Sequence, residues 1–368
     1  MEVRTIGVEE EFLLVDPEKG RVVERAAAVL REVPAGRDLV DHELLEHLLE
    51  TRTEPCTDMA DARMQLVGAR RLLGQAARDI GVAAVATGTA PVPVDQVEVS
   101  PKDRYRDMVN EFGAIARNAG TCGMHVHVGI SSREEGIGVI DRMRPWLPLV
   151  LALSVNSPFS DGRDSGYASW RSQVWSRWPT AGATELFGDP ETYDALVADL
   201  ESAGAARDVG MVYFEARLGD AYPTVEVRVA DVCTDPDDAL VVAATVRAIA
   251  TMAATEWRAG TPPRPWRSEL LRAAAWRAGR YGLAGTLLDP GGPDKQHSVA
   301  PARDVLEAFV QRTRRVLEQA GDLDLVTDGF ERLLGATGAT HQRAAYERTG
   351  SVGGVVADLV DRTEAVWR

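Results

Sequence analysis

The stretch TCGMHVHVGI, residues 121–130, combines the pattern of a β-strand with a pair of histidines. Met124, Val126 and Val128 alternate with His125 and His127, and side chains in a strand alternate between the two faces of the sheet. Both histidines therefore lie on one face of the predicted strand. The whole chain has only 6 histidines, so the pair indicates either a functional site or a hydrogen-bonded pair inside a sheet.

Four further segments predict strands with charged residues along one face. A solvated face of an antiparallel sheet is usually rich in Thr, Lys and Ser, whereas these faces carry mainly Glu, Arg and His. We therefore predict an α+β fold with a curved antiparallel sheet, helices packed on its back and a charged concave face that holds an active site. Simple solvation of the charged face remains the alternative. The residues that share a face are Glu9 and Glu11 in 7–15, Glu50, Arg52 and Glu54 in 48–54, Tyr213, Glu215 and Arg217 in 212–218, and Glu226 and Arg228 in 224–231.

Two long helices are marked by their capping residues. Residues 58–80 begin at Asp58, a good N-cap, and are followed by a glycine. Residues 236–259 follow Asp235 and begin with a proline, which is favoured at the first helical position. Both segments are therefore predicted as helices.

No repeat or linker divides the chain, so we predict a single catalytic domain over residues 1–368. The sheet-containing part covers about 1–290 and a helical C-terminal part covers about 299–368, where apolar residues recur at spacings of three and four. Between these parts, the Gly/Pro-rich stretch 284–301 is predicted as a long loop. Long ordered loops are often functional, and residues 285–298 of this loop are predicted to act as a lid over bound nucleotide.

Composition and charge narrow the class of protein. Hydrophobic residues make up 45% and charged residues 26% of the chain, which is typical of a globular protein with a core. The net charge of −15 argues against a nucleic-acid partner. The most apolar run, residues 146–155, is too short to span a membrane. The three cysteines are scattered and odd in number, so we expect a reduced, cytoplasmic protein without a disulfide framework.

The residues of the charged face suit a particular chemistry. Several carboxylates, an imidazole and two arginines suggest a hard divalent cation and an anionic substrate. Oxygen-rich sites favour Mg²⁺ or Mn²⁺, and a structural zinc site would contain more Cys and His. A pair of histidines two residues apart on a strand also occurs in zinc hydrolases, so this motif alone does not choose between the two.

Six segments together resemble the glutamate–cysteine ligase type 2 family and, within it, the shorter carboxylate–amine ligases. In order from about residue 5 to about 290, they are GVEEEFLLVD, LLETRTEPC, TCGMHVHVGI, LALSVNSPFSDGRDSGYASWR, PTVEVRVAD and GRYGLAG. The resemblance implies a glutamine synthetase-like fold, with ATP and Mg²⁺ or Mn²⁺ held on the concave face. It also implies that ATP phosphorylates the γ-carboxylate of glutamate, that an amine then forms the amide, and that ADP and phosphate are released.

The resemblance also implies roles for individual residues. Arg228 and Arg217 are assigned to the transferring phosphate or the substrate carboxylate, where a planar guanidinium offers two donors. Three further residues are expected to contact nucleotide or substrate: His125, Arg280 and Arg171. Of these, His125 is expected either to support the metal ligands or to contact the substrate. The metal and nucleotide cluster comprises Glu9, Glu11, Glu50, His127 and Glu226.

The segment YFEAR, residues 213–217, departs from the family pattern, in which a tryptophan–aspartate pair often precedes the strand arginine. This change casts doubt on the acceptor rather than on the phosphoryl chemistry. Cysteine is the default acceptor, and another amino acid or a simple amine is an open alternative. We expect small-molecule substrates (glutamate, the amine and ATP), no nucleic acid, no membrane, and a homo-oligomer, as a dimer.

Two other classes of protein fit the same residues. A metal-dependent amidase would use the Glu/His cluster to activate water and would need no ATP. A non-catalytic module would keep the fold and bind a nucleotide or metabolite. The release of ADP with and without glutamate distinguishes all three interpretations.

Overall fold

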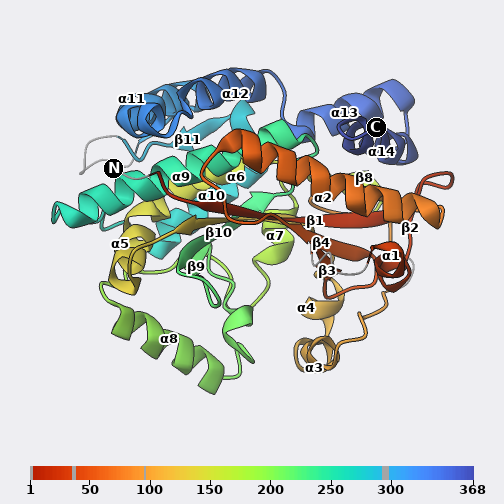
Figure 1. Cartoon of the computed structure of the whole chain (residues 1–368), viewed down its shortest axis with the longest axis horizontal. Helices are drawn as coiled ribbons and strands as arrows, with labels where there is room; N and C mark the ends of the chain where they lie inside the picture. The colour runs from red at the N-terminus through yellow and green to blue at the C-terminus, as the bar shows by residue number, and fades with distance from the viewer. Residues whose placement is uncertain (1–2, 35–38, 95–96, 292–297) are drawn as a thin grey trace.

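The computed structural model describes residues 3–34, 39–94, 97–291 and 298–368 (Figure 1). Its centre is a mixed-length antiparallel sheet with the strand order β3–β4–β1–β6–β10–β9, and β2 and β5 also pair with β1. The sheet is open, with β3 and β9 at its two ends. The strands are β1 (Ile6–Asp16), β2 (Arg21–Val22), β3 (Val40–His42), β4 (Leu48–Arg52), β5 (Ala83–Val85), β6 (Gly123–Gly129), β9 (Ala216–Leu218) and β10 (Thr224–Asp231).

The register of this sheet brings the charged residues of separate strands together. Residues directly opposite each other in an antiparallel pair have their side chains on the same face. The charged sets of β1, β4, β6 and β10 therefore merge into one charged face, as the sequence predicts. The opposed pairs are Glu9 with His125, Glu11 with Glu50, and Glu226 with His127.

The other face of the sheet is apolar and is covered by helices. Val8, Val126 and Val227 are buried in one core with residues of these helices. Figure 1 shows α2 and α9 along this side of the sheet, whereas α3, α4 and α8 lie on the opposite side. The covering helices are α2 (Met59–Asp79), α5 (Arg133–Met143), α6 (Leu147–Ser154) and α9 (Pro236–Arg258).

Helix α9 is the one helix in the described ranges that is long and apolar enough to cross a membrane. Of its most apolar window, 89% is buried inside the molecule. The position of α9 against the sheet and the outer helices accounts for this composition, because a helix that is hydrophobic all round belongs in a core.

The predicted helix boundaries are confirmed at both long helices. The Asp58 side chain accepts hydrogen bonds from the backbone amides of Ala60 and Asp61 at the start of α2. The Asp235 side chain accepts one from the amide of Asp237 at the start of α9. These bonds satisfy amides that the helix itself leaves without acceptors.

The C-terminal part of the chain is helical from α11 to α14. Figure 1 shows α11 and α12 stacked outside α9, and α14 packs against β5. These helices therefore extend the layer behind the sheet rather than the charged face. They are α11 (Ala302–Ala320), α12 (Leu323–Gly335), α13 (Gly338–Thr349) and α14 (Val352–Ala365).

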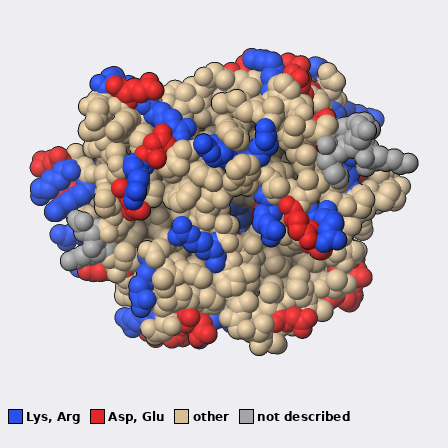
Figure 2. Space-filling model, turned by 180° about the vertical axis from the view of Figure 1, so that it is seen from behind, with Lys and Arg blue, Asp and Glu red and all other residues tan. Residues whose placement is uncertain are grey.

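The remaining elements surround the sheet. Seen from behind, the molecular surface carries acidic and basic side chains in mixed order, and several basic side chains border a hollow near the middle (Figure 2). The remaining helices and hairpin strands are α1 (Ala26–Glu32), α3 (Asp103–Phe112), α4 (Ala114–Arg117), α7 (Arg171–Trp175), α8 (Pro190–Ser202), α10 (Ser268–Tyr281), β7 (Phe159–Ser160), β8 (Arg163–Asp164), β11 (Thr286–Leu288) and β12 (Val299–Pro301).

The predicted strand over 212–218 is wrong in its first half. Only β9 forms, and residues 212–215 are irregular, with one isolated bridge from Phe214 to Gly182. Neighbouring rings enter different clusters: Tyr213 packs on Trp175, and Phe214 packs on Phe187. Side-chain packing therefore sets the path of this segment. In its partner β10, the register with β6 shifts between Val227 and Ala230 and then resumes with Ala230 opposite Met124.

The predicted long loop over 284–301 is in part a hairpin. Its ends pair as β11 and β12, because Leu287 is buried in the main core and holds β11 in place. Residues 292–297 of the predicted lid, residues 285–298, lie outside the described residues. The lid stays a prediction.

Candidate active site

Glu9 of β1 lies between the two histidines of β6. Its Oε2 atom is 3.1 Å from Nδ1 of His125, and its Oε1 atom is 3.4 Å from Nε2 of His127. Glu9, Glu50 and His125 can each offer one ligand atom within 4.8 Å of the others, and so can Glu9, His127 and Glu226. Two possible three-ligand groups therefore share Glu9.

Glu11 lies at the edge of this arrangement. Its Oε2 atom accepts a hydrogen bond of 2.5 Å from the backbone amide of Gly123, and its Oε1 atom is 3.7 Å from Nε2 of His125. Glu11 is thus next to the cluster and outside both three-ligand groups.

Two arginines share the carboxylate of Glu226. Nε of Arg217 is 2.7 Å from Oε2, and the Arg228 guanidinium contacts Oε1. The Arg228 guanidinium also lies 5.8 Å from the centre of the Tyr213 ring. The predicted metal-binding residues and the predicted catalytic arginines therefore meet at one side chain.

Carboxylates are crowded at the β3–β4 end of the cluster. Burial, with the neighbouring charges of Glu9, Glu43 and Glu11, raises the pKa of Glu50 well above its usual value. Burial and the charge of Glu11 raise the pKa of Glu43 to about 7. Negative charge therefore exceeds what the protein neutralises here, and a bound divalent cation would relieve the repulsion.

Positive groups dominate at the other end of the cluster. Burial raises the pKa of Glu226, but Arg228 and Arg217 outweigh it and hold the pKa below its usual range. Burial acts in the same way on Glu9, and the two histidines outweigh it. Both carboxylates are therefore ionised and available as ligands at neutral pH.

The histidines present ring nitrogens that suit a metal ion. Burial, together with the charge of Arg228, lowers the pKa of His125, which favours the neutral imidazole that ligates metals. Burial lowers the pKa of His127, but Glu9 and Glu226 outweigh it and raise the pKa overall. Within the described ranges, Nε2 of each ring is buried without a hydrogen-bond partner. With the surrounding carboxylates, these atoms fit a divalent cation of the Mg²⁺ or Mn²⁺ kind.

The other predicted contact residues differ in position. Arg171 is 1% exposed, lies over Trp175, and reaches the backbone carbonyl of Arg228 at 3.4 Å, so the fold brings it next to the cluster. Arg280, near the end of α10, lies between the rings of Tyr167 and Tyr281 at 5.3 and 5.2 Å. The structure shows no contact between Arg280 and the cluster in the residues it describes.

A buried aspartate holds the segment that carries Arg171. Asp231, at the end of β10, accepts hydrogen bonds from the amide of Asn156 and the hydroxyls of Ser157 and Ser169. The Ser157 hydroxyl in turn accepts a bond from the Arg171 amide. The Ser/Gly-rich segment therefore acts as a positioning element for the end of the sheet.

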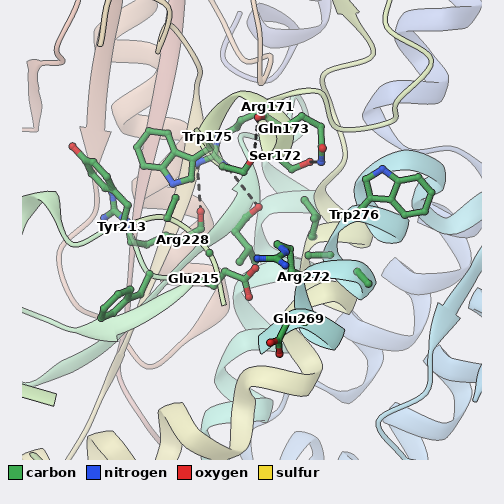
Figure 3. Close-up of a pocket in the computed structure, with 18 residues that line it drawn as sticks. Arg171, Ser172, Gln173, Trp175, Tyr213, Glu215, Arg228, Glu269, Arg272 and Trp276 are labelled. Carbon is green, nitrogen blue, oxygen red and sulfur yellow. Dashed lines mark hydrogen bonds between the residues drawn. The ribbon is translucent and has the colours of Figure 1, made fainter. Parts of the chain in front are cut away.

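Sequence reasoning missed Glu43 and a cavity. Glu43 follows β3 outside any alternating pattern, so only the folding of β3 onto β4 places it near Glu50. The cavity, of about 630 Å³, lies where α7, α10 and the β9–β10 edge meet, and Figure 3 shows its lining side chains. Its wall combines residues from distant parts of the chain, including Arg171, Trp175, Tyr213, Glu215, Arg228 and Trp276.

Comparisons with solved structures support the fold. The chain superposes on the crystal structure of a bifunctional glutathione synthetase from Pasteurella multocida with a TM-score of 0.74 and 16% identity, covering 98% of this chain and 52% of that one. It superposes on a glutamate–cysteine ligase from Francisella tularensis, solved in complex with AMP, with a TM-score of 0.68 and 11% identity, covering 100% and 89%. The predicted glutamine synthetase-like α+β fold is confirmed.

Sequence comparisons show the family. A "Putative glutamate–cysteine ligase 2-1" of Nocardioides sp. is 54% identical over 376 residues, covering 100% of this chain and 97% of the relative. A "Putative glutamate–cysteine ligase 2" of Streptomyces coelicolor is 47% identical over 367 residues, covering 99% and 100%. The model of glutamate-cysteine ligase family 2 matches residues 5–361. The chain therefore belongs to glutamate-cysteine ligase family 2 and is a ligase of the carboxylate–amine kind.

Proposed function

We propose that the chain is an ATP-dependent ligase that joins the γ-carboxylate of glutamate to an amine through an acyl phosphate. The observation that carries the proposal is the meeting of the carboxylate–histidine cluster with Arg217 and Arg228 at Glu226. Phosphoryl transfer between ATP and a carboxylate brings two anions together, so it needs cations and fixed donors around the phosphoryl oxygens.

In the proposed site, Glu9, Glu50, His127 and Glu226 would hold Mg²⁺ or Mn²⁺, with His125 beside them. The metal ions would neutralise charge on the phosphoryl oxygens. Glu11 and Glu43 would complete the ring of carboxylates. These side chains are held by neighbouring strands, so their geometry is set before substrate binds.

The arginines have a separate role. Arg228 and Arg217 would orient the transferring phosphate or the substrate carboxylate with their planar donors. The γ-phosphoryl group of ATP passes to a glutamate oxygen, which leaves ADP. The amine nitrogen then bonds to the acyl carbon, phosphate departs with the electron pair of the C–O bond, and one N–H proton is lost.

We also propose that the whole chain works as one catalytic domain in the cytoplasm. The charged face is built from β1 to β10, and the C-terminal helices pack behind it. An amidase that used the same cluster would leave the arginine pair on Glu226 without a phosphoryl group to bind.

An isotope experiment tests the mechanism. Glutamate labelled with ¹⁸O in its γ-carboxylate, incubated with ATP, Mg²⁺ and a panel of amines that includes cysteine, should transfer one labelled oxygen to inorganic phosphate for each amide formed. The nucleotide product should be ADP. Unlabelled phosphate or AMP as product would overturn the acyl phosphate. Turnover of an amide without nucleotide would favour the amidase.

A further inference from the structure

The cavity beside Arg228 contains a carboxylate that the proposed phosphoryl chemistry does not use. Figure 3 shows the Glu215 carboxylate pointing into the middle of the cavity, between Arg228 on one side and Arg272 on the other. In the described part of the chain, the Oε2 atom of Glu215 is buried and has no hydrogen-bond partner. Burial raises the pKa of Glu215 to about 7, and Arg144 offsets this only in part. A donor from a bound molecule would satisfy this oxygen.

The backbone places Glu215 next to the reacting groups. The amide of Arg228 donates a hydrogen bond of 3.0 Å to the carbonyl of Glu215, and the neighbouring opposed pair is Glu226 with Arg217 two residues further along. A molecule held by Glu215 therefore lies directly beside the arginines to which the proposed function gives the phosphoryl group. That is the position an incoming nucleophile needs.

The other charged groups of the wall are engaged or exposed. Arg228 is paired with Glu226, and Arg171 faces the backbone carbonyls of β10. Glu269, the second acid of the wall, is 53% exposed and is held by Arg267 at 2.7 Å. Glu215 is therefore the wall carboxylate that is free to bind a cation inside the cavity.

The rest of the wall suits the body of an organic cation. Trp175, Tyr213, Phe214 and Trp276 contribute aromatic rings, and ring faces attract ammonium groups and bury carbon. The volume of about 630 Å³ is that of a small-molecule site. A cavity with a carboxylate and aromatic walls can bind an organic ammonium ion, because the carboxylate pairs with its charge and the rings bury its carbon atoms.

We propose that this cavity binds the acceptor substrate as a primary ammonium ion, with the ammonium on Glu215 and the carbon body against the aromatic rings. The ammonium gives one proton to the Glu215 carboxylate, and the neutral amine that results is the nucleophile. The proposal rests on the proposed function, because it names the class of amine for that reaction. It also explains why the departure from the family pattern falls at residues 213–217, in the wall of the acceptor site.

Calorimetry with benzylammonium chloride tests the cavity without turnover. The wild-type chain should bind it saturably and should not bind benzyl alcohol, its uncharged counterpart. Glu215→Gln should weaken binding about 10- to 100-fold, which is the loss expected for a hydrogen bond between charged groups. Glu269→Gln, at the exposed rim, should bind like the wild type. Absence of wild-type binding, or an unchanged affinity in Glu215→Gln, would overturn the proposal.

Hydroxylamine separates this proposal from the proposed function. As a small uncharged nucleophile, it should trap the acyl phosphate as a hydroxamate in the presence of glutamate and ATP. At subsaturating benzylamine, Glu215→Gln should lower the ratio of benzylamide to hydroxamate formed by about 10- to 100-fold, because only the amide product needs the ammonium contact. If the wild type forms no hydroxamate, the proposed function is rejected. Calorimetry would still measure whether the cavity binds benzylammonium. If Glu215→Gln lowered the rate of hydroxamate formation as much as it lowered the affinity for benzylammonium, Glu215 would belong to the phosphoryl chemistry. That result would overturn the acceptor assignment.

Discussion

At the scale of single residues, Glu226 is the point on which the site converges. Its two oxygens are held by different arginines, and Nδ1 of His125 lies 3.8 Å away. Arg228 is buried, so its guanidinium is fixed by Glu226 and by the Tyr213 ring rather than by solvent. The function of such a buried, fixed guanidinium depends on its planar pair of donors as well as on its charge.

Arg228→Lys tests this sensitivity. Lysine keeps the charge but loses the planar pair of donors, so kcat should fall about 100-fold or more with little change in the melting temperature. Arg21→Lys is the matched control, because Arg21 is 57% exposed and lies at the far end of β1–β2. Steady-state ADP release measures both. A kcat within threefold of the parent for Arg228→Lys would show that the planar donors of Arg228 are not needed for catalysis.

Glu50→Gln tests the cation site. Because the pKa of Glu50 is raised, the cation-free protein loses stability as pH rises above the ordinary carboxyl range, and the glutamine variant should be more stable at pH 8 without metal. With Mn²⁺ the order should reverse, because the variant loses a ligand and the stabilisation that binding provides. Melting temperatures with and without Mn²⁺ measure this. Glu54→Gln, in the exposed loop after β4, should show neither effect. The same Mn²⁺ shift in Glu50→Gln as in the parent would contradict the assignment.

Glu215→Gln should show a pH-dependent gain of stability. The folded-state pKa of about 7 lies above the ordinary value of 4.5, so the folded protein loses stability as pH rises from 4.5 to 7. The glutamine variant avoids this loss and should match the parent at pH 4. At pH 8 it should gain at most about 3 kcal/mol. Urea unfolding at both pH values measures the difference, and an equal gain at both would show that ionisation of Glu215 is not its cause.

At the scale of elements, a buried ion pair fixes α2 on the back of the sheet. Glu10 of β1 and Arg70 of α2 lie 2.6 Å apart, and both side chains are at most 1% exposed. Arg70 also donates to the backbone carbonyls of Cys233 and Thr234, which follow β10. One arginine thus joins β1 and the segment that follows β10 to one helix.

Breaking this pair should be far more costly than replacing it. Glu10→Gln leaves Arg70 buried without its counter-charge and should lower the free energy of unfolding by about 3–5 kcal/mol. The double change Glu10→Leu and Arg70→Met removes both charges and should cost less than the single change. Urea denaturation of the three proteins measures the cycle. A double variant that is less stable than Glu10→Gln would show that the carbonyl contacts of Arg70 dominate.

At the scale of the whole molecule, the chain is a sheet with helices on its apolar face and the candidate active site on its charged face. The helices behind the sheet, including α9 and the C-terminal helices, provide burial, and the opposite face carries the carboxylate–histidine cluster. Changes on the two sides should therefore have different consequences, on stability behind the sheet and on activity in front of it.

The predicted homodimer belongs to this scale and stays a prediction. Light scattering coupled to size exclusion should give about twice the chain mass of 39.8 kDa. A mass equal to that of one chain would contradict it.

Elements whose signals are local can be predicted from the sequence alone. Strand alternation identified the charged sides of β1, β4, β6 and β10, and the Asp caps identified the starts of α2 and α9. These features need only neighbouring residues, because side-chain period and capping bonds are set within a few positions of the chain.

Features that join distant segments depend on tertiary packing and could not be predicted from the sequence. Glu43 reached the cluster through strand pairing, Arg280 was drawn to Tyr167 instead of the sheet, and residues 212–215 left the strand because their rings pack in separate clusters. The cavity around Glu215 likewise exists only where α7, α10 and β10 meet. Such contacts depend on how side chains fill space between elements, and no local period in the sequence carries that information.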